Sequence, residues 1–412
     1  MTLSHKSQKK EIANLESLYI KMEYNAIILG TDHNSYSVAR SFHEAFGKKP
    51  IVAGSAVLVP FYKSKISDIY TEKNFSTDDN VFVETLNKLA KSRDEEEFIF
   101  FAPTEHYVDL LVRNAKNFDF SYHIPYPDPK DAEKLLRKSE FYKILEEIGV
   151  SYPKSFVADR TNFKDLDLDG EIFLKADEYD DFIASDIKIK QKGYHVMDKE
   201  EAINILENIY DSEFDGHIIC QEFIHGGQGS EYSLNGYRAK DGKISMVLAR
   251  NLLSDMRPMW VGNHLVQVDH EDREMYNLAE KIVESLDYHG LFNLDFKKDS
   301  KSGKVYTLEM NIRQGRTFYY STLAGVNLIK IATEDMILGK SVAERTKKPF
   351  MLTAINKNVA RNHVDKDLLE EFDDKKRNEN SEIHIINSFD DGILRNMRVK
   401  DALRRQEKEL YD

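Results

Sequence analysis

Two neighbouring stretches of alternating polar and apolar residues constrain the fold more than any other feature of the sequence. In the later stretch, one set of alternate positions is polar and consists of Thr307, Glu309 and Asn311. The other set is apolar and consists of Leu308, Met310 and Ile312. Successive side chains of a strand point to opposite faces of a sheet. The pattern therefore predicts a strand with one core face and one face that presents a carboxylate beside an amide.

The earlier stretch, Gly290–Phe296, alternates in the same way and places Asn293 and Asp295 on its polar face. The polar segment Lys298–Gly303 between the stretches is typical of a hairpin turn. A hairpin can bring Asp295 opposite Glu309, although the sequence leaves the register open. Two adjacent carboxylates repel unless a cation lies between them. Because Mg²⁺ takes one or two protein carboxylates, the hairpin predicts a magnesium site, with a solvated strand face as the alternative.

Composition limits the class of protein. The chain has 412 residues, enough for two or three domains, and 41% of them are apolar, as in globular proteins. The net charge of -13 argues against a general binder of nucleic acids or anionic membranes. The single cysteine, Cys220, excludes an intramolecular disulfide and lies in an apolar run, as a buried structural thiol would.

The ends of the chain and its apolar runs bear on location. The N-terminal residues Met1–Lys6 contain no apolar signal core. No apolar run approaches the roughly 18 residues that would span a bilayer. We therefore expect a cytoplasmic protein without an integral membrane segment.

Residues 24–125 alternate strand and helix patterns, after a polar tail at 1–23 that predicts one loose helix. The predicted strands are Asn25–Gly30, Ile51–Ala53, Ile66–Tyr70 and Glu97–Phe101. The predicted helices are Ser35–Phe46, Val81–Lys91 and His106–Ala115. This order predicts a parallel sheet covered by helices. Ligands of such sheets bind beyond the carboxyl ends of the strands, here at Thr31–Asn34 and Pro103–Glu105, unless these segments are only helix caps.

The proline-rich segment Tyr122–Pro129 predicts a domain boundary. A helix at Asp131–Gly149 and a buried strand at Glu171–Ala176 follow. Lys175 lies near the end of this strand. Burial of its ammonium costs free energy unless the group meets an anion, such as a nucleotide phosphate, or the side chain extends to solvent. We expect an acidic loop at Asp177–Asp186, then a strand at Ile187–Val196 that carries Lys188, Lys190 and Lys192 on one side. This side is a solvated face, with contact of one lysine with phosphate as the alternative.

The remaining elements are predicted from the same patterns. They are a helix at Glu200–Tyr210, a strand at His217–Ile224, antiparallel strands at Glu231–Tyr237 and Lys243–Ala249, and a helix at Glu271–Asp287. Residues 346–412 predict a small C-terminal extension with helices at Asp365–Phe372 and Lys400–Glu409. We expect the last helix to cover the domain or a partner rather than a membrane.

The order of the polar residues resembles that of the ATP-grasp ligases. It consists of Lys138, Lys175, Glu222-Phe223-Ile224, Asp295, and then Glu309, Asn311 and Arg313. The resemblance implies an α/β protein with a parallel-sheet domain at 24–125. It also implies a two-subdomain ATP-grasp domain at 126–345, divided after residue 220, and an extension at 346–412.

The resemblance also implies roles for these residues. Lys138 and Lys175 would bind ATP phosphates, and Glu222-Phe223-Ile224 would hold adenine. The metal ligands for two magnesium ions would be Asp295, Glu309 and Asn311. Arg313 would stabilise the transferring phosphoryl group or the acyl phosphate. Glu231 is the candidate ribose ligand, with nearby Gln228 or a merely exposed Glu231 as alternatives.

Longer segments are similar to bacterial D-aspartate ligases. These segments are Leu29–Phe42, Glu44–Lys48, Lys138–Tyr142, Val261–Asn263 and Asn311–Arg316. The similarity implies that ATP activates the β-carboxylate of D-aspartate and that a lysine amine of a UDP-linked peptidoglycan precursor accepts it. Arg316 would read the free carboxylate of the amino acid, and His264 is a candidate cleft residue with a role-free loop histidine as its alternative.

The chain departs from the family pattern in one segment, and two alternative functions remain open. The acidic segment 177–186 takes the place of a glycine-rich phosphate lid. Because ATP and metal motifs are shared, a ligase for another amino acid or dipeptide is one alternative. A non-catalytic nucleotide sensor is another, although the chain retains all three candidate metal ligands.

Overall fold

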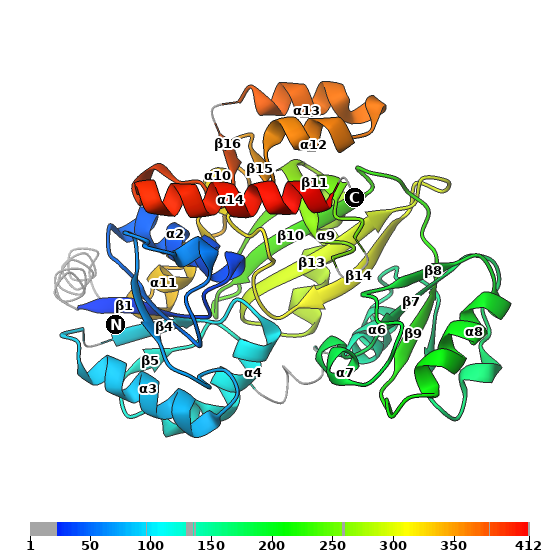
Figure 1. The fold of residues 1–412 in the computed structure, drawn as a ribbon, viewed down its shortest axis with the longest axis horizontal. Coiled ribbons are helices and arrows are strands. Elements are labelled where there is room, and N and C mark those ends of the chain that lie inside the picture. Colours follow the sequence, from blue (N-terminus) through cyan, green and yellow to red (C-terminus); the bar gives the residue numbers. More distant parts are fainter. Residues whose placement is uncertain are drawn as a thin grey trace, which may run out of the picture.

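The computed structural model describes residues 23–410, except for 96, 129–134, 136, 258–259 and 379. The expected helix in the N-terminal tail lies outside the described residues. Within them, the chain forms a five-stranded, a four-stranded and a seven-stranded sheet. The four-stranded sheet stands apart at one end of the molecule, and the other two lie against each other (Figure 1).

The five-stranded sheet has the order β3-β2-β1-β4-β5 with all neighbours parallel, as predicted. Its strands are β1 (Tyr24–Leu29), β2 (Ile51–Gly54), β3 (Asp68–Thr71), β4 (Glu97–Phe101) and β5 (Tyr122–His123). Its helices are α2 (His33–Phe46), α3 (Asp79–Lys91) and α4 (Glu105–Asn114), with short 3₁₀ turns η1 (Val59–Phe61) and η2 (Ala115–Asn117).

The turn after β1 depends on a glycine. Gly30 has a φ of +89°, and a Cβ there would lie 2.8 Å from the Tyr107 ring and 2.9 Å from Ser35 Oγ. Only glycine adopts this conformation and this close approach without strain. The Asp32 side chain then accepts a hydrogen bond from Ser35 N and starts α2. The segment 31–34 is thereby held at the carboxyl edge of the sheet.

The four-stranded sheet has the antiparallel order β6-β9-β7-β8. Its strands are β6 (Ser155–Ala158), β7 (Ile172–Ala176), β8 (Tyr194–Val196) and β9 (Ile218–Glu222). Around it lie α6 (Lys138–Glu147), η3 (Phe163–Asp165), α7 (Tyr179–Ala184) and α8 (Lys199–Tyr210). Cys220 is fully buried in this core, and burial raises the pKa of its thiol to about 12, which confirms a structural thiol.

Two predictions for this region are wrong. Segment 177–186 contains helix α7 instead of an uninterrupted loop, and within 187–196 only Tyr194–Val196 forms a strand. The reason lies in Lys190, whose ammonium donates to the carbonyls of Ile183 and Ser185 at the end of α7. A lysine commonly satisfies the last carbonyls of a helix. Residues 187–193 therefore wrap around the helix end, where they cannot pair with β7.

The seven-stranded sheet has the order β14-β13-β10-β11-β12-β15-β16 and is antiparallel except for β15 and β16. Its strands are β10 (Glu231–Arg238), β11 (Ile244–Ser254), β12 (His264–Asp269), β13 (Gly290–Lys298), β14 (Val305–Asn311), β15 (Met351–Thr353) and β16 (Ser381–Ile383). Helices α9 (Arg273–Ser285), α10 (Tyr320–Leu323) and α11 (Leu328–Leu338) accompany it. The predicted antiparallel pair and the hairpin are both present.

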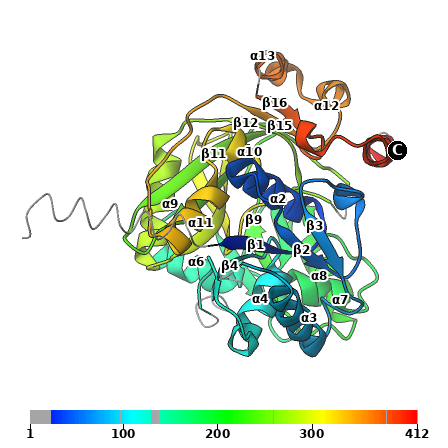
Figure 2. The same cartoon turned by 90° about the vertical axis from the view of Figure 1, so that its left-hand side faces the viewer.

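The C-terminal segment joins two parts of the fold. Strands β15 and β16 extend the large sheet, while α12 (Lys357–His363), η4 (Lys366–Leu368) and α13 (Leu369–Lys376) project from it (Figure 2). The turn η5 (Ser388–Asp390) and helix α14 (Ile393–Glu409) follow, and α14 packs against η1. Asp390 and Arg395 also contact Tyr36 of α2. Asp390 and Arg395 form an ion pair of 2.9 Å, with both side chains fully buried. The end of the chain is thus anchored on the N-terminal sheet.

Candidate active site

The hairpin of β13 and β14 places the two acids as predicted. Asp295 lies directly opposite Glu309, and Asn293 lies opposite Asn311. Asn311 Nδ2 donates to Asn293 Oδ1 at 2.8 Å, and Asn293 Nδ2 donates to Ser233 Oγ at 2.8 Å. The side-chain nitrogen of Asn311 is therefore used in this chain of hydrogen bonds. The side-chain oxygen of Asn311 accepts a hydrogen bond of 3.3 Å from the Arg313 guanidinium.

The prediction that Thr307 shares the polar face of Glu309 is wrong. The pairing shifts between Asp295 and Phe296, so that Phe296 lies opposite Thr307 and Leu308 is the extra residue of a β-bulge. Thr307 turns into the core and is fully buried, whereas Leu308 is only half-buried. The Leu308 carbonyl accepts a hydrogen bond of 2.9 Å from the hydroxyl of Tyr142 on α6. The bulge thus ties the hairpin to α6.

Three lysines from the small-sheet region face the hairpin. Lys175 comes from β7, and its Nζ donates to the Tyr142 hydroxyl at 3.0 Å. Lys138 begins α6, and its Nζ donates to the Asp177 carbonyl at 3.2 Å. Lys192, which lies just before β8, donates to Asn263 Oδ1 at 3.3 Å. The sequence predicts a solvated face for Lys192 or, as the alternative, contact with phosphate, and the structure places Lys192 with the two nucleotide candidates.

Electrostatic interactions shift the pKa values of the two hairpin acids in opposite directions. Burial alone would raise the pKa of Glu309, but attraction from Lys138, Lys175, Lys192 and Arg313 outweighs burial and lowers that pKa to about 2. Burial, and then repulsion from Glu309, raise the pKa of Asp295 to about 7. Burial also lowers the pKa of Lys175, against the attraction of Glu309. Without another cation, the pair therefore keeps its negative charge on Glu309.

The first acid of segment 177–186 has a structural role. Asp177 is 3% exposed, and its carboxylate accepts hydrogen bonds from Ser139 N at 3.0 Å and Ser139 Oγ at 2.6 Å. An anion beside the first turn of a helix accepts hydrogen bonds from the free backbone N–H groups there and interacts favourably with the helix dipole. Asp177 therefore holds the start of α6, with Lys138, close to the end of β7.

The turn after β4 reaches the same site. A cavity beside the hairpin is lined by Glu105, Leu135, Lys138, Phe141, Glu309, Met310 and Asn311. Glu105 begins α4, and its Oε1 lies 3.0 Å from a guanidinium nitrogen of Arg313. The expected ligand position at Pro103–Glu105 thus borders the cavity. The sequence does not indicate the contact of Glu105 with Arg313, because the two residues are 208 positions apart.

A second polar cluster surrounds Arg316. Its guanidinium lies 5.5 Å from the centre of the Trp260 ring, and burial lowers its pKa against the attraction of Asp32. Burial and then Arg316 lower the pKa of His33 to about 4. The ring of His384 lies 5.8 Å from that of His33. The segment 31–34 and the C-terminal segment therefore meet beside Arg316, and nothing in the sequence pattern marks His384.

The candidate adenine segment lies at the end of β9. Glu222 Oε1 accepts a hydrogen bond of 2.8 Å from Lys154 N, so this carboxylate is engaged locally. The Phe223 ring stacks on His195 with centroids 3.9 Å apart, and its amide donates to the Glu171 carbonyl. Ile224 is 5% exposed. The three residues therefore form an ordered segment at the carboxyl end of β9.

The candidate ribose residue lies nearby on β10. Glu231 accepts from Ser254 Oγ at 2.9 Å and lies 3.5 Å from Lys297 Nζ. Lys297 Nζ is in turn 5.3 Å from the centre of the Phe223 ring, so Lys297 links Glu231 to the candidate adenine segment. Gln228, the alternative, is engaged with the C-terminal segment through the His363 carbonyl and the Asp365 amide.

His264 lies among the charged residues of the cleft. Its Nδ1 is 3.1 Å from Gln267 Nε2. Burial lowers the pKa of His264. Glu231 and Glu309 raise that pKa, and Lys192 and Arg316 lower it further. Those neighbours come from both sides of the candidate site, which is the position expected of a cleft residue.

The hairpin fits magnesium better than a transition metal. Within the described ranges, no three or more His, Cys, Asp or Glu side chains gather in a way that could hold a metal ion. The candidate set instead consists of two carboxylates and one amide. Asp295 Oδ1 is buried without a hydrogen-bond partner. Oxygen ligands supplemented by phosphate and water are what Mg²⁺ prefers, and an orphaned buried carboxylate oxygen favours such a cation.

Comparison with known proteins identifies the family. Residues 222–358 match a family described as ATP-grasp in the biosynthetic pathway with Ter operon. The chain is 30% identical over 334 residues to a D-aspartate ligase of Enterococcus faecium, covering 79% of each chain. It belongs to the ATP-grasp ligases. The predicted family is thereby confirmed, and the protein is an ATP-dependent carboxylate–amine ligase.

Solved structures agree on the fold. An N5-carboxyaminoimidazole synthetase of Staphylococcus aureus, complexed with ADP, has a TM-score of 0.58 at 16% identity and covers 86% of each chain. An L-amino acid ligase of Bacillus licheniformis has a TM-score of 0.56 at 13% identity, with coverage of 77% of this ligase and 75% of the other chain. The predicted α/β class is therefore confirmed. None of the helices in the described part of the chain has the length and apolar character to cross a membrane.

Proposed function

We propose that this ligase joins the β-carboxylate of D-aspartate to the side-chain amine of a lysine in a UDP-linked peptidoglycan precursor. The similarity to the enterococcal D-aspartate ligase over 79% of both chains carries the choice of substrate. The cluster around Arg316 supports it, since an amino acid needs a cation for its free carboxylate.

Lys138 and Lys175 bind the phosphates of ATP, and Lys192 assists them. Support comes from their positions, because all three ammonium groups act on the charge of Glu309. The adenine lies against Glu222-Phe223-Ile224. Within the described residues, the Ile224 amide donates no hydrogen bond and is therefore available to the base. Glu231 binds the ribose.

Two magnesium ions would be held by Asp295, Glu309 and Asn311 and would neutralise charge on the ATP phosphates. The spread of the pKa values supports this assignment. Attraction from the lysines and Arg313 outweighs burial and lowers the pKa of Glu309, whereas burial and the charge of Glu309 raise the pKa of Asp295. Cation binding would therefore displace a proton from Asp295.

The reaction follows from this placement. A carboxylate oxygen of the amino acid attacks the γ-phosphorus of ATP, the bond to the β-phosphate oxygen breaks, and ADP leaves. The acceptor amine then attacks the acyl carbon, inorganic phosphate leaves with the electron pair, and the amine proton passes to solvent. Arg313, held by Glu105 at 3.0 Å, stabilises charge on the transferring group, and Arg316 orients the amino acid.

Two alternatives are separated by one assay. A ligase for another amino acid would use the same nucleotide and metal residues, and the likeness to an L-amino acid ligase concerns only the fold. A non-catalytic nucleotide sensor would not need both hairpin acids, which this chain retains.

The test is magnesium-dependent release of ADP from purified protein. D-aspartate or L-aspartate is offered with and without a UDP-linked pentapeptide that contains lysine. Release that requires both D-aspartate and the peptide, with the new amide located by mass spectrometry, is the expected result. Release with a different amino acid would refute the substrate but keep the chemistry. Bound ATP without release under any pairing would favour the sensor.

A further inference from the structure

A second hollow lies away from the hairpin, between α2, the start of α12, the end of α13 and β16. Its volume is about 540 Å³, and it shares no lining residue with the cavity beside Glu309. Its polar lining includes Arg40, Lys357, Asn358, Lys376, Ser381 and Glu382. Ligand pockets typically measure about 300–1,000 Å³. The hollow is therefore large enough for a ligand group.

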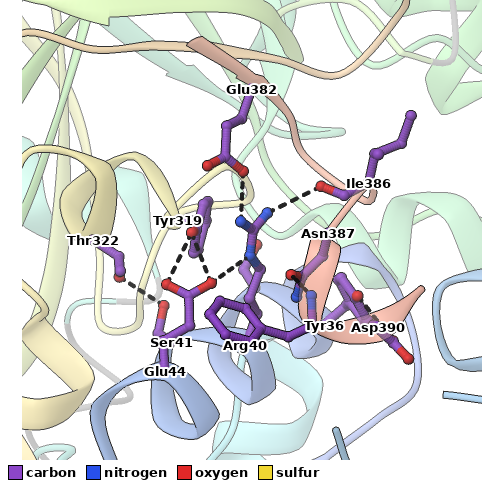
Figure 3. Close-up of polar contacts among 12 residues, drawn as sticks. Tyr36, Arg40, Ser41, Glu44, Tyr319, Thr322, Glu382, Ile386, Asn387 and Asp390 are labelled. Atoms are coloured by element: carbon purple, nitrogen blue, oxygen red, sulfur yellow. Dashed lines mark hydrogen bonds and ion pairs between the residues drawn. The ribbon is translucent and has the colours of Figure 1, made fainter. Parts of the chain in front are cut away.

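Arg40 forms the rigid floor of this hollow. Its Nε lies 2.8 Å from Glu44 Oε1, another of its nitrogens pairs with Glu382, and its guanidinium stacks 3.9 Å from the centre of the Tyr319 ring (Figure 3). Its side chain is 4% exposed. Two carboxylates thus compensate the charge of Arg40, and Glu382 also attracts the ammonium of Lys357.

The two lysines of the hollow make no direct ion pair. Lys357 Nζ donates to the Ser381 carbonyl, and Lys376 Nζ donates to Asn358 Oδ1 at 2.8 Å. Among the described residues, neither ammonium has a carboxylate within ion-pair distance, and the nearby Asp373 pairs with Arg361. The Ser381 hydroxyl is also buried without a partner. Two ammonium groups, an amide and a free hydroxyl are the donors that a phosphate group recruits.

The hollow is connected to the amino-acid end of the active site. Helix α2 carries His33 beside Arg316 and Arg40 in the hollow, and these positions are seven residues apart, or about 10 Å along a helix. β16 and the residue after it run antiparallel to this part of α2, since Glu382 contacts Arg40 and His384 contacts Ser37. The amino-acid end of the active site and the hollow therefore lie about 10 Å apart along α2, a separation that an extended substrate can bridge.

We propose that this hollow binds the diphosphate of the nucleotide-linked acceptor, with Lys357 and Lys376 as its cationic ligands. The proposal rests on the proposed function for the identity of the acceptor but not for the chemistry of the pocket. The diphosphate group can come from the acceptor or from free inorganic pyrophosphate, and the test separates the two sources.

The pocket itself is tested without catalysis. Pyrophosphate is titrated by calorimetry into the full-length protein saturated with MgADP, so that the nucleotide site is filled. Lys376→Gln and Lys357→Gln should each weaken pyrophosphate binding about tenfold, because each removes one charge-assisted contact. Arg377→Gln is the matched control, since Arg377 lies on the next position after α13, is 71% exposed and pairs with Asp374. Equal binding by all four proteins would overturn the pocket.

The source of the phosphate is tested by steady-state kinetics. The two lysine variants should raise KM for the UDP-linked peptide about tenfold and leave KM for ATP and the amino acid unchanged, while Arg377→Gln behaves as the unmodified protein. Weakened pyrophosphate binding with an unchanged peptide KM would overturn the acceptor assignment and leave a site for free phosphate. If D-aspartate and the peptide are not substrates, the proposed function fails, but the calorimetric result still decides whether the pocket binds the anion.

Discussion

Replacement of Asp390 by asparagine should destabilise the protein by about 3–5 kcal/mol, because it leaves Arg395 charged and buried. Both side chains are fully buried and 2.9 Å apart. The Asp390 carboxylate also accepts hydrogen bonds from Tyr36 at 3.0 Å, from Ser64 at 2.8 Å and from the Lys65 amide at 2.6 Å. An asparagine presents one acceptor oxygen where four donors converge, so its NH₂ group faces at least one other donor.

The size of this effect follows from what remains around Arg395. Its guanidinium would keep hydrogen bonds to the carbonyls of Pro60 at 3.0 Å and Ile385 at 3.1 Å. Carbonyl dipoles compensate part of a buried charge but carry no net charge. Substitution of both partners, Asp390→Asn with Arg395→Met, removes the buried charge and should restore about half or more of the loss.

The assay is urea unfolding of the full chain, with Asp391→Asn as the control. Asp391 is the next residue, is exposed and bonds only to Asn396 among side chains of the described chain. Its replacement should change the free energy of unfolding by less than about 0.5 kcal/mol. A loss below about 1 kcal/mol for Asp390→Asn, or a double variant that is weaker than the single one, would refute the reasoning.

Four further predictions concern the candidate site. Glu309→Gln should lower ADP release at least about 100-fold with an unchanged unfolding curve, and normal release would count against the metal assignment. Lys175→Ala should weaken ATP binding about tenfold or more in calorimetry, and unmodified affinity would remove Lys175 from the nucleotide site. Arg316→Lys should raise KM for the amino acid about tenfold and leave KM for ATP unchanged, because lysine lacks the bidentate fork; equal effects on both constants would contradict a specific carboxylate contact. His33 has a pKa of about 4 in the fold, below its usual value near 6.5, so the unfolded chain binds more protons between these values. The free energy of unfolding should therefore fall by about 2 kcal/mol as the pH is lowered to 5, because the unfolded chain takes up a proton on His33 that the fold does not. His33→Gln should remove this part of the pH dependence, measured by urea unfolding at each pH.

Local pattern sufficed for the hairpin and for most of the parallel sheet. The alternation around Asp295 and Glu309 determines which side chains share a face, and a six-residue polar segment joins the strands. Pairing of one acid with the other then needs only a short loop closure. The bulge at Leu308 escaped prediction, because it depends on the contact of the Leu308 carbonyl with Tyr142 on a distant helix.

Two contacts of the site join residues that lie far apart in the chain. Glu105 meets Arg313 across 208 positions, and His384 meets Ser37 across 347. Lys192 was assigned to a strand by its alternation with Lys188 and Lys190, yet the bond from Lys190 to the end of α7 turns the segment away from the sheet. No periodicity encodes such contacts, because each depends on how separate elements pack.

The distribution of charge between the two sheets explains why the site lies where it does. The three lysines that act on Glu309 belong to the small-sheet region, while Asp295 and Glu309 belong to the large sheet. The lysines therefore attract Glu309 across the site. ATP would bring negative phosphates to the lysines, and magnesium would bring positive charge to the acids. Each ligand would thus replace one partner of this attraction.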